Sequence, residues 1–135
     1  MTSKSDKFLI PPVSPAAGGP LYEQIVEAVK REICNGRIKP GQPLPSFRSL
    51  AEQLLVSVIT VKRAYEELER EGIIYRRQGL GTFVSENGAA RSRKAKLKNA
   101  TDLFKEAVSE ARGAGMGDEE IMTLLQDMIS DKKGD

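Results

Sequence analysis

The side chains best suited to chemistry lie in the middle of the chain and are basic or hydroxyl-bearing. Arg48 stands alone, whereas Ser57, Thr60, Lys62 and Arg63 follow one another closely. Guanidinium, ammonium and hydroxyl groups donate hydrogen bonds to phosphate oxygens and to the edges of bases. These residue types therefore favour recognition of a nucleic acid over catalysis.

Residues for the common catalytic and metal chemistries are missing from the sequence. Histidine is absent, and Cys34 is the single cysteine. Without histidine, neither a His-based triad nor the usual zinc, nickel or copper site can form. We therefore expect no enzyme, no cofactor, no metal site and no internal disulfide. Cys34 is expected to be a small core residue at a helix end.

Charge is distributed unevenly along the chain, although the net charge is only +2. Residues 1–19 and 20–86 each carry a net +1, residues 87–98 carry +5, and residues 99–135 carry −5. A basic strip thus separates a balanced segment from an acidic one. No apolar run is long enough for a membrane helix, so we expect a cytoplasmic protein with no membrane partner.

Apolar residues recur at helical spacing through much of residues 20–86. The pattern predicts helices over about 20–35 and 57–70, with a shorter helix between them that begins at Ser46. Ser46 and Ser57 are suited to cap these helices, because a serine hydroxyl accepts hydrogen bonds from the free N–H groups of a first turn. The expected buried face of the shorter helix consists of Leu50, Ala51, Leu54 and Leu55.

A hairpin is expected after the third helix. Residues 73–77 and 82–84 are rich in β-forming side chains, and Gly79 and Gly81 lie between them. A helix, two helices joined by a tight turn, and a hairpin make a winged helix-turn-helix. The predicted fold class is therefore mainly α with a small β-hairpin: a winged helix-turn-helix DNA-binding domain over residues 20–86, followed by a short two-helix dimerisation tail.

The other segments are interpreted as an arm, a linker and a tail. Residues 1–19 are rich in proline and glycine and predict a flexible N-terminal arm. Residues 87–96 are expected to be a basic linker, because the helical pattern resumes only at about residue 97. Residues 97–135 contain two amphipathic helices broken by glycines, the second of them capped by Asp118. Their apolar stripes require a partner surface, and a second copy of the chain is the simplest one.

Four segments give a more specific signal when they are read together. They are Leu44-Pro45-Ser46-Phe47-Arg48-Ser49-Leu50-Ala51, Val56-Ser57-Val58-Ile59-Thr60-Val61-Lys62-Arg63-Ala64, Glu67-Leu68-Glu69-Arg70-Glu71-Gly72 and Gly79-Leu80-Gly81-Thr82-Phe83-Val84. Their order and spacing resemble the DNA-binding domain of the GntR family of bacterial transcription regulators, over about Leu21–Ser85. The two-helix tail looks like that of the YtrA subfamily, whose members lack a large effector domain and dimerise through the tail. The resemblance implies a repressor that binds a palindromic operator in double-stranded DNA as a homodimer.

The resemblance and the chemistry of the residues together assign the expected DNA contacts. The helix that begins at Ser57 would enter the major groove by its N-terminal end, and the hairpin would reach the minor groove. The family pattern assigns Arg48 to DNA, and Gly79 would let the hairpin tip approach closely. The expected DNA-binding residues are Arg48, Ser57, Val58, Ile59, Thr60, Lys62, Arg63 and Gly79.

Val58 departs from the family pattern. Many relatives carry arginine at this position, where it bonds a guanine. Val58 and Ile59 can contact a thymine methyl group but cannot hydrogen-bond a base. We therefore expect an operator that differs from the common family sequence.

Simpler interpretations of the same residues stay open. Arg48 could cap or pair locally, and Lys62 and Arg63 could be solvated charges paired with nearby glutamates. Ser57 and Gly79 could serve only their helix and their turn. The alternative function is a winged-helix interaction module that binds no specific DNA. An unidentified small-molecule effector between the tail helices and the winged domain is also left open.

Overall fold

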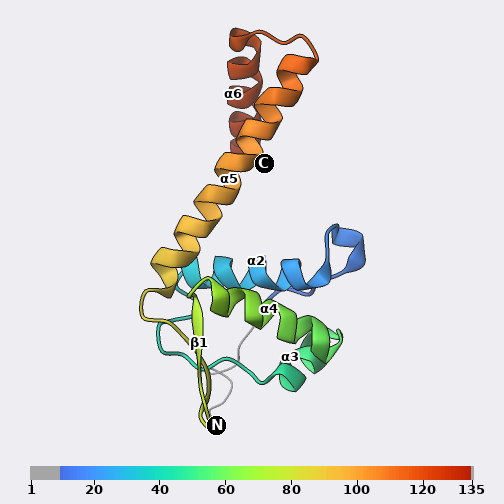
Figure 1. The fold of residues 1–135 in the computed structure, drawn as a ribbon. Helices are drawn as coiled ribbons and strands as arrows, with labels where there is room; N and C mark the ends of the chain where they lie inside the picture. The colour runs from blue at the N-terminus through green and yellow to red at the C-terminus, as the bar shows by residue number, and fades with distance from the viewer. Residues whose placement is uncertain (1–9, 135) are drawn as a thin grey trace. The chain divides into compact units, whose positions relative to one another are not determined.

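The computed structural model describes residues 10–134. Its elements are η1 (Pro15–Ala17), α2 (Leu21–Cys34), α3 (Phe47–Leu54), α4 (Val58–Arg70), β1 (Ile74–Arg77), β2 (Gly81–Val84), α5 (Gly88–Gly113) and α6 (Asp118–Gly134) (Figure 1). The chain divides into two compact units, residues 1–96 and residues 97–135, which are called here the winged unit and the tail. Within residues 10–134, no helix is long and apolar enough to cross a membrane.

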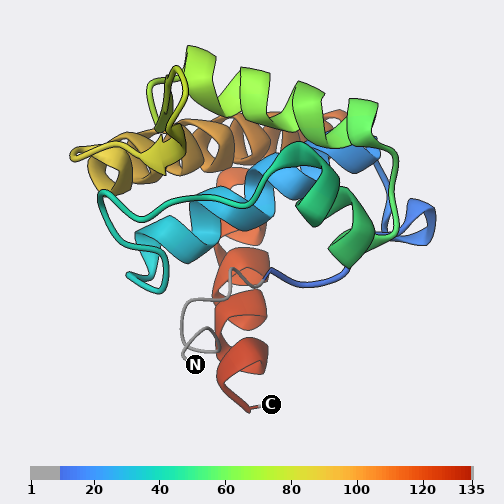
Figure 2. The same cartoon turned by 90° about the horizontal axis from the view of Figure 1, so that it is seen from below.

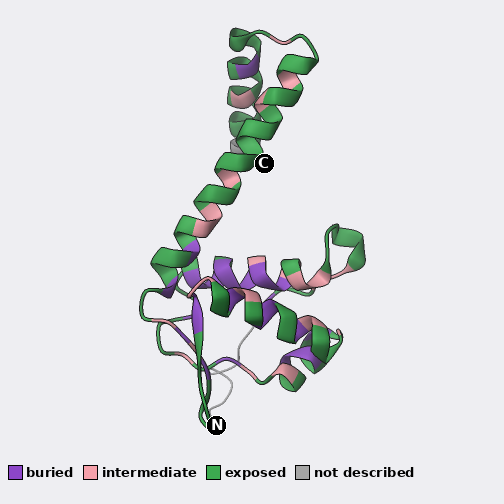
Figure 3. Ribbon diagram, viewed as in Figure 1, coloured by how far each residue is buried: buried purple, intermediate pink, exposed green. Residues whose placement is uncertain are grey.

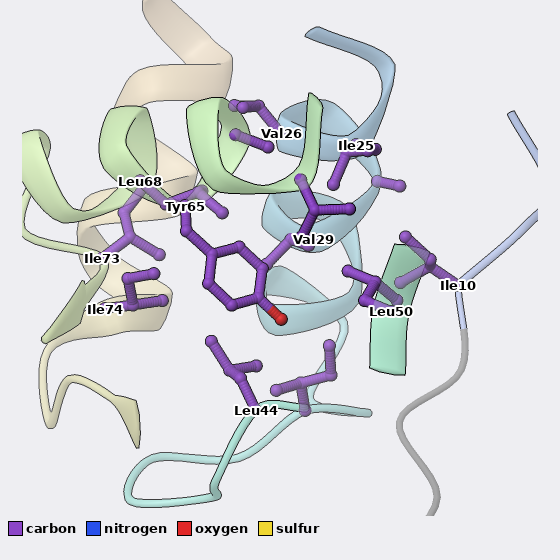
Figure 4. Packing of buried hydrophobic residues seen from close by; sticks show 14 of the residues in the cluster. Ile10, Ile25, Val26, Val29, Leu44, Leu50, Tyr65, Leu68, Ile73 and Ile74 are labelled. Carbon is purple, nitrogen blue, oxygen red and sulfur yellow. The ribbon is translucent and has the colours of Figure 1, made fainter. Parts of the chain in front are cut away.

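One hydrophobic core holds the winged unit together. α4 packs against both α2 and α3, and the two longer helices run side by side (Figure 2). Buried residues follow the inner sides of these helices (Figure 3). In Figure 4 the ring of Tyr65 lies among aliphatic side chains from α2, α3, β1 and the loop before α3. The apolar residues that recur at helical spacing along α4 are all buried, namely Val61, Ala64, Tyr65 and Leu68.

The helices α3 and α4 each begin directly after the serine that was expected to cap them. Ser46 Oγ accepts a hydrogen bond from the N–H of Ser49 at 3.0 Å, and Ser57 Oγ accepts one from the N–H of Thr60 at 3.1 Å. Each serine has extended backbone and satisfies a donor that has no partner inside its helix. The predicted boundaries of α2 and α4 agree with the structure to within one residue.

Two residues that were expected in the core are exposed. Leu55 ends α3 in the left-handed region, with a φ of 59°, and its side chain is 90% exposed. Its spacing from Ala51 placed it on the buried face, but α3 ends before it and the left-handed turn redirects the side chain. Val56 packs against the core in its place. Cys34 is also exposed, in the last turn of α2.

β1 and β2 form the expected antiparallel hairpin, with Ile74 opposite Val84 and Arg77 opposite Gly81. The loop before α3 is attached to this hairpin, because the N–H of Leu44 donates to the carbonyl of a β2 residue at 2.9 Å. Three helices followed by a two-stranded hairpin are a winged helix-turn-helix. The predicted fold class, mainly α with a small β-hairpin arranged as a winged helix-turn-helix, is therefore confirmed.

The residues that were predicted to form a basic linker, 87–96, are mostly helical. α5 begins at Gly88, not at about residue 97, and its first turns bury Gly88 and Ser92. An added Cβ at Gly88 would lie 3.1 Å from a backbone carbonyl oxygen and from a valine methyl group. Lys96 forms an ion pair with Glu27 of α2. The apolar pattern missed this segment, because the helix buries small residues in it.

The described part of the predicted N-terminal arm, residues 10–19, packs against the rest of the winged unit. Ile10 is buried in the core, and Val13 packs against it. Gln24 Nε2 donates to the carbonyl of Ser14 at 2.8 Å. These contacts attach residues 10–19 to α2, whereas residues 1–9 of the predicted arm lie outside the described residues.

The tail contains the expected pair of helices separated by glycines. Gly115 in the connection has a φ of 92°. Asp118 is the first residue of α6 and not its cap, and its carboxylate accepts a hydrogen bond from Arg112 at 2.9 Å. Ile121 is buried. The tail exposes the large apolar side chains of Leu97, Leu103, Phe104, Met122, Leu124, Met128 and Ile129.

Candidate nucleic-acid interface

Two hydroxyl residues build the N-terminal turn of α4. Ser57 caps the helix, and the hydroxyl oxygens of Ser57 and Thr60 lie 2.9 Å apart. Ser57 is exposed and Thr60 is half-buried, so both side chains lie at the surface. The positive end of the helix dipole coincides with these hydroxyls, which makes this turn favourable for an anion.

Two apolar residues follow the cap and project into solvent. Val58 is 43% exposed and Ile59 is 79% exposed. The core face of the same turn is supplied by Val61, which is fully buried. Exposed aliphatic side chains at this place offer contact to a methyl group but no hydrogen bond.

Lys62 and Arg63 are adjacent on α4 but differ in their contacts. Lys62 is exposed, and no hydrogen-bond or ion-pair partner for it occurs within residues 10–134. The guanidinium carbon of Arg63 lies 4.0 Å from the centre of the Tyr22 ring in α2, and Arg63 Nη2 donates to the Tyr22 hydroxyl at 3.4 Å. In the described part of the chain, neither residue pairs with a glutamate.

Arg48 lies in the first turn of α3, directly after Phe47. Its side chain is exposed and has no partner among the described residues. The local capping interaction of α3 is made by Ser46, so the guanidinium of Arg48 is left with all of its donors unengaged.

Gly79 lies in the turn of the hairpin, between β1 and β2. It has a φ of 79°, which glycine adopts without strain. The neighbouring Leu80 is 68% exposed. Arg77 at the end of β1 is exposed and unpaired within residues 10–134. The hairpin tip therefore combines an exposed backbone at Gly79, an exposed apolar side chain and a positive charge.

A cleft separates the hairpin from the start of α3. Its walls include Phe47, Arg76 and Thr82, and Tyr65 reaches it from α4. The guanidinium carbon of Arg76 lies 5.1 Å from the centre of the Phe47 ring. The Tyr65 hydroxyl donates to the carbonyl of Pro45 at 2.8 Å, and burial raises the pKa of Tyr65 well above its ordinary value. This neutral phenol fixes the loop that leads into α3.

Arg70 at the other end of α4 is committed to an internal ion pair. Its Nε donates to a carboxylate oxygen of Glu67 at 3.2 Å, and its Nη2 bonds the other oxygen. The hydrogen bonds from Arg70 lower the pKa of Glu67 to about 2. This ion pair engages Nε and Nη2 of Arg70, whereas Lys62 in the first two turns of α4 has no such partner within residues 10–134.

The predicted site residues fall into three places. Arg48 lies on α3 and Gly79 on the hairpin. The first turns of α4 and its cap bring together Ser57, Val58, Ile59, Thr60, Lys62 and Arg63. The contact of Arg63 with Tyr22 of α2 was not predicted, because it joins two helices that are far apart in the sequence.

Comparison with known proteins gives matches over the winged unit and beyond it. Residues 21–84 match the family described as bacterial regulatory proteins, gntR family. The chain is 36% identical over 122 residues to the HTH-type transcriptional repressor YtrA of Bacillus subtilis, which covers 90% of this chain and 94% of that protein. A GntR family transcriptional regulator from Listeria monocytogenes has a similar structure, with a TM-score of 0.70 and 34% identity over 82% of this chain and 96% of the other. YtrA from Sulfolobus acidocaldarius gives a TM-score of 0.52 and 28% identity over 90% and 97% of the two chains.

The similarity to YtrA of Bacillus subtilis covers more of the chain than the winged helix-turn-helix. The matched family consists of regulatory proteins, which confirms the expectation of a DNA-binding protein that is not an enzyme. A winged helix-turn-helix, a two-helix tail and a match over nearly the whole chain lead to one conclusion. The chain belongs to the GntR family of transcription regulators and is similar to its YtrA members.

Proposed function

We propose that this regulator is a repressor that binds a palindromic operator in double-stranded DNA as a homodimer. The N-terminal turns of α4 enter the major groove, and the hairpin reaches the minor groove. The observation that carries the proposal is the pair of exposed basic residues, Arg48 and Lys62, that have no partner within residues 10–134. Binding of this kind covers a promoter and blocks transcription from chromosomal DNA, which places the protein in the cytoplasm.

The roles of the α4 residues follow from their chemistry. Ser57 and Thr60 donate hydroxyl hydrogen bonds to a phosphate beside the helix start, and Lys62 adds a positive charge. Val58 and Ile59 contact thymine methyl groups in the major groove, because their exposed tips carry no polar atom. The operator is therefore expected to place thymines where many related operators present a guanine.

Two further DNA contacts come from outside α4, from Arg48 in α3 and from Gly79 in the turn of the hairpin. The unengaged guanidinium of Arg48 binds a phosphate or a guanine through paired N–H donors. At the hairpin tip, Gly79 brings the backbone close to the minor groove, because it has no side chain. Exposed Leu80 beside it fits an apolar contact with the groove wall.

The tail supports the homodimer in this proposal. Leu103 and Phe104 in α5, and Met128 and Ile129 in α6, are each more than half exposed. Large apolar surfaces of this kind mark interaction sites, and a second copy of the same chain supplies a matching stripe. Two winged units joined through their tails would read two half-sites about one helical turn apart.

The test is direct binding of the full chain to duplex DNA from upstream of its own gene. The salt concentration is raised stepwise, and unrelated duplex DNA is added as competitor. The proposal predicts tight binding that survives the competitor and weakens steeply with salt. Binding that any DNA abolishes equally would contradict sequence specificity, and no binding at low salt would favour the interaction-module alternative.

A further inference from the structure

The contact between Tyr22 and Arg63 joins the start of α2 to the recognition helix α4. The guanidinium carbon lies 4.0 Å from the ring centre, which is the geometry of a cation–π interaction. Arg63 Nη2 donates to the Tyr22 hydroxyl at 3.4 Å, and that hydroxyl donates to Glu23 Oε2 at 3.3 Å. The half-buried ring of Tyr22 thus holds one conformation of a long and otherwise mobile side chain.

The neighbouring Lys62 shows what this contact adds. Lys62 is exposed and has no partner within residues 10–134, so its side chain loses its rotamer freedom only when DNA binds. Arg63 has already lost much of that freedom on the Tyr22 ring. A donor that is ordered before binding loses less entropy when the complex forms.

The direction in which Arg63 is held indicates the kind of DNA group that it meets. An α-helix with its side chains nearly fills the width of the major groove. Side chains at the tip of such a helix face base edges, whereas side chains on its flank face the sugar–phosphate walls. Because Arg63 leans towards α2, its guanidinium lies on the flank of α4.

We propose that Tyr22 is a positioning residue that holds Arg63 for a backbone phosphate of the operator, an inference that rests on the proposed function. The ring covers one face of the guanidinium, and the Tyr22 hydroxyl accepts a hydrogen bond from one of its five N–H donors, so that the others are left for phosphate oxygens. Tyr22 acts through Arg63 and carries no sequence preference itself.

The test compares Tyr22→Leu, Tyr22→Phe, Arg63→Ala and the double variant on one duplex that the wild-type protein selects from a random pool. Arg63→Ala is expected to weaken binding about tenfold and to lower the salt slope by about 1. Tyr22→Leu should weaken binding by a smaller factor than Arg63→Ala does. It should cause no further loss when Arg63 is already alanine. Tyr22→Phe should restore wild-type affinity, because it keeps the ring.

Ethylation interference on the same duplex identifies the phosphate. Ethylation of one phosphate per half-site should block binding of the wild-type protein, should have no effect on binding of Arg63→Ala, and should have a reduced effect on binding of Tyr22→Leu. Lys105→Ala, which removes an exposed charge in the tail, is the control and should leave that phosphate essential.

Two results would overturn the inference. The first is an equal loss of DNA affinity on Tyr22→Leu whether or not Arg63 is present, which would mean that Tyr22 has a merely structural role. The second is unchanged binding by Tyr22→Leu. Both are distinct from failure of the proposed function, which would appear as no selective binding by the wild-type protein.

Discussion

Leu68 and Leu103 both lie on the apolar stripe of an amphipathic helix, and their surroundings differ. Leu68 in α4 is fully buried, whereas Leu103 in α5 is 57% exposed. The contrast extends to the two units. The winged unit closes its stripes into one core, whereas in the described part of the tail Ile121 is the buried hydrophobic residue.

The difference shows which unit is complete within one chain. Burial of apolar surface stabilises a fold only where another apolar surface covers it. In the winged unit this surface comes from within the unit itself. Among the described residues of the tail, the same kind of stripe is exposed, which supports the proposal that the tail forms the dimer.

Deletion of residues 97–135 removes the tail and is expected to have the largest effect on oligomeric state and on operator affinity. The truncated protein should be a monomer, and its affinity for the operator should fall by a factor of about 10²–10⁴, because the two half-sites are no longer bound together. Sedimentation equilibrium and a binding titration measure the two effects. A truncated form that stays dimeric at micromolar concentration would contradict dimerisation through the tail.

Alanine substitutions of Leu68 and of Leu103 compare the winged unit with the tail in the full chain. Leu68→Ala should lower the free energy of unfolding by about 2–5 kcal/mol, because it leaves a cavity in a closed core. Leu103→Ala should change the monomer little and weaken the dimer. Urea unfolding at several protein concentrations separates these effects, and equal losses at both sites at high dilution would refute the assignment.

Arg48→Ala tests the surface that the winged unit leaves free. Operator affinity should fall about 10- to 100-fold, since a lost specific contact costs about 1–3 kcal/mol. The melting temperature should stay unchanged, because Arg48 has no partner among the described residues. Lys105→Ala is the control for charge, and a folded Arg48→Ala protein with intact affinity would contradict the role of this residue.

Leu55→Gly has the smallest expected effect. The left-handed conformation costs a leucine about 1 kcal/mol, and the side chain, at 90% exposure, returns no packing energy. Glycine should raise the free energy of unfolding by up to about 1 kcal/mol. Thermal unfolding measures this change, and a clear loss of stability would show that Leu55 packs against another part of the protein.

Much of the fold could be predicted from the sequence, because local rules and the core agree in the winged unit. Ser46 and Ser57 are capping residues in sequence and in structure, and Tyr65 lies where helical spacing puts a core residue. The start of α5 could not be predicted in this way. Gly88 is buried by the close approach of a backbone carbonyl, and Ser92 is buried as well, but neither residue is a large apolar one that a helical pattern would reveal.

For the candidate site, the sequence predicted which residues lie together at the start of α4, but not the contact between Arg63 and Tyr22. The first turns of α4 carry the predicted cluster, since one helix and one cap determine it. The pairing of Arg63 with Tyr22 depends on how α2 and α4 pack, and spacing along either helix does not contain that information. The burial of Leu55 was predicted wrongly for a related reason, because the turn after α3 overrides the helical period.

The central claim is that two winged units of one dimer read two matching half-sites. A hydroxyl-radical footprint of the full-length protein on the duplex that it selects tests this most directly. We predict two protected segments related by a two-fold axis, with centres about one helical turn apart. A single protected segment, or protection without symmetry, would contradict the claim.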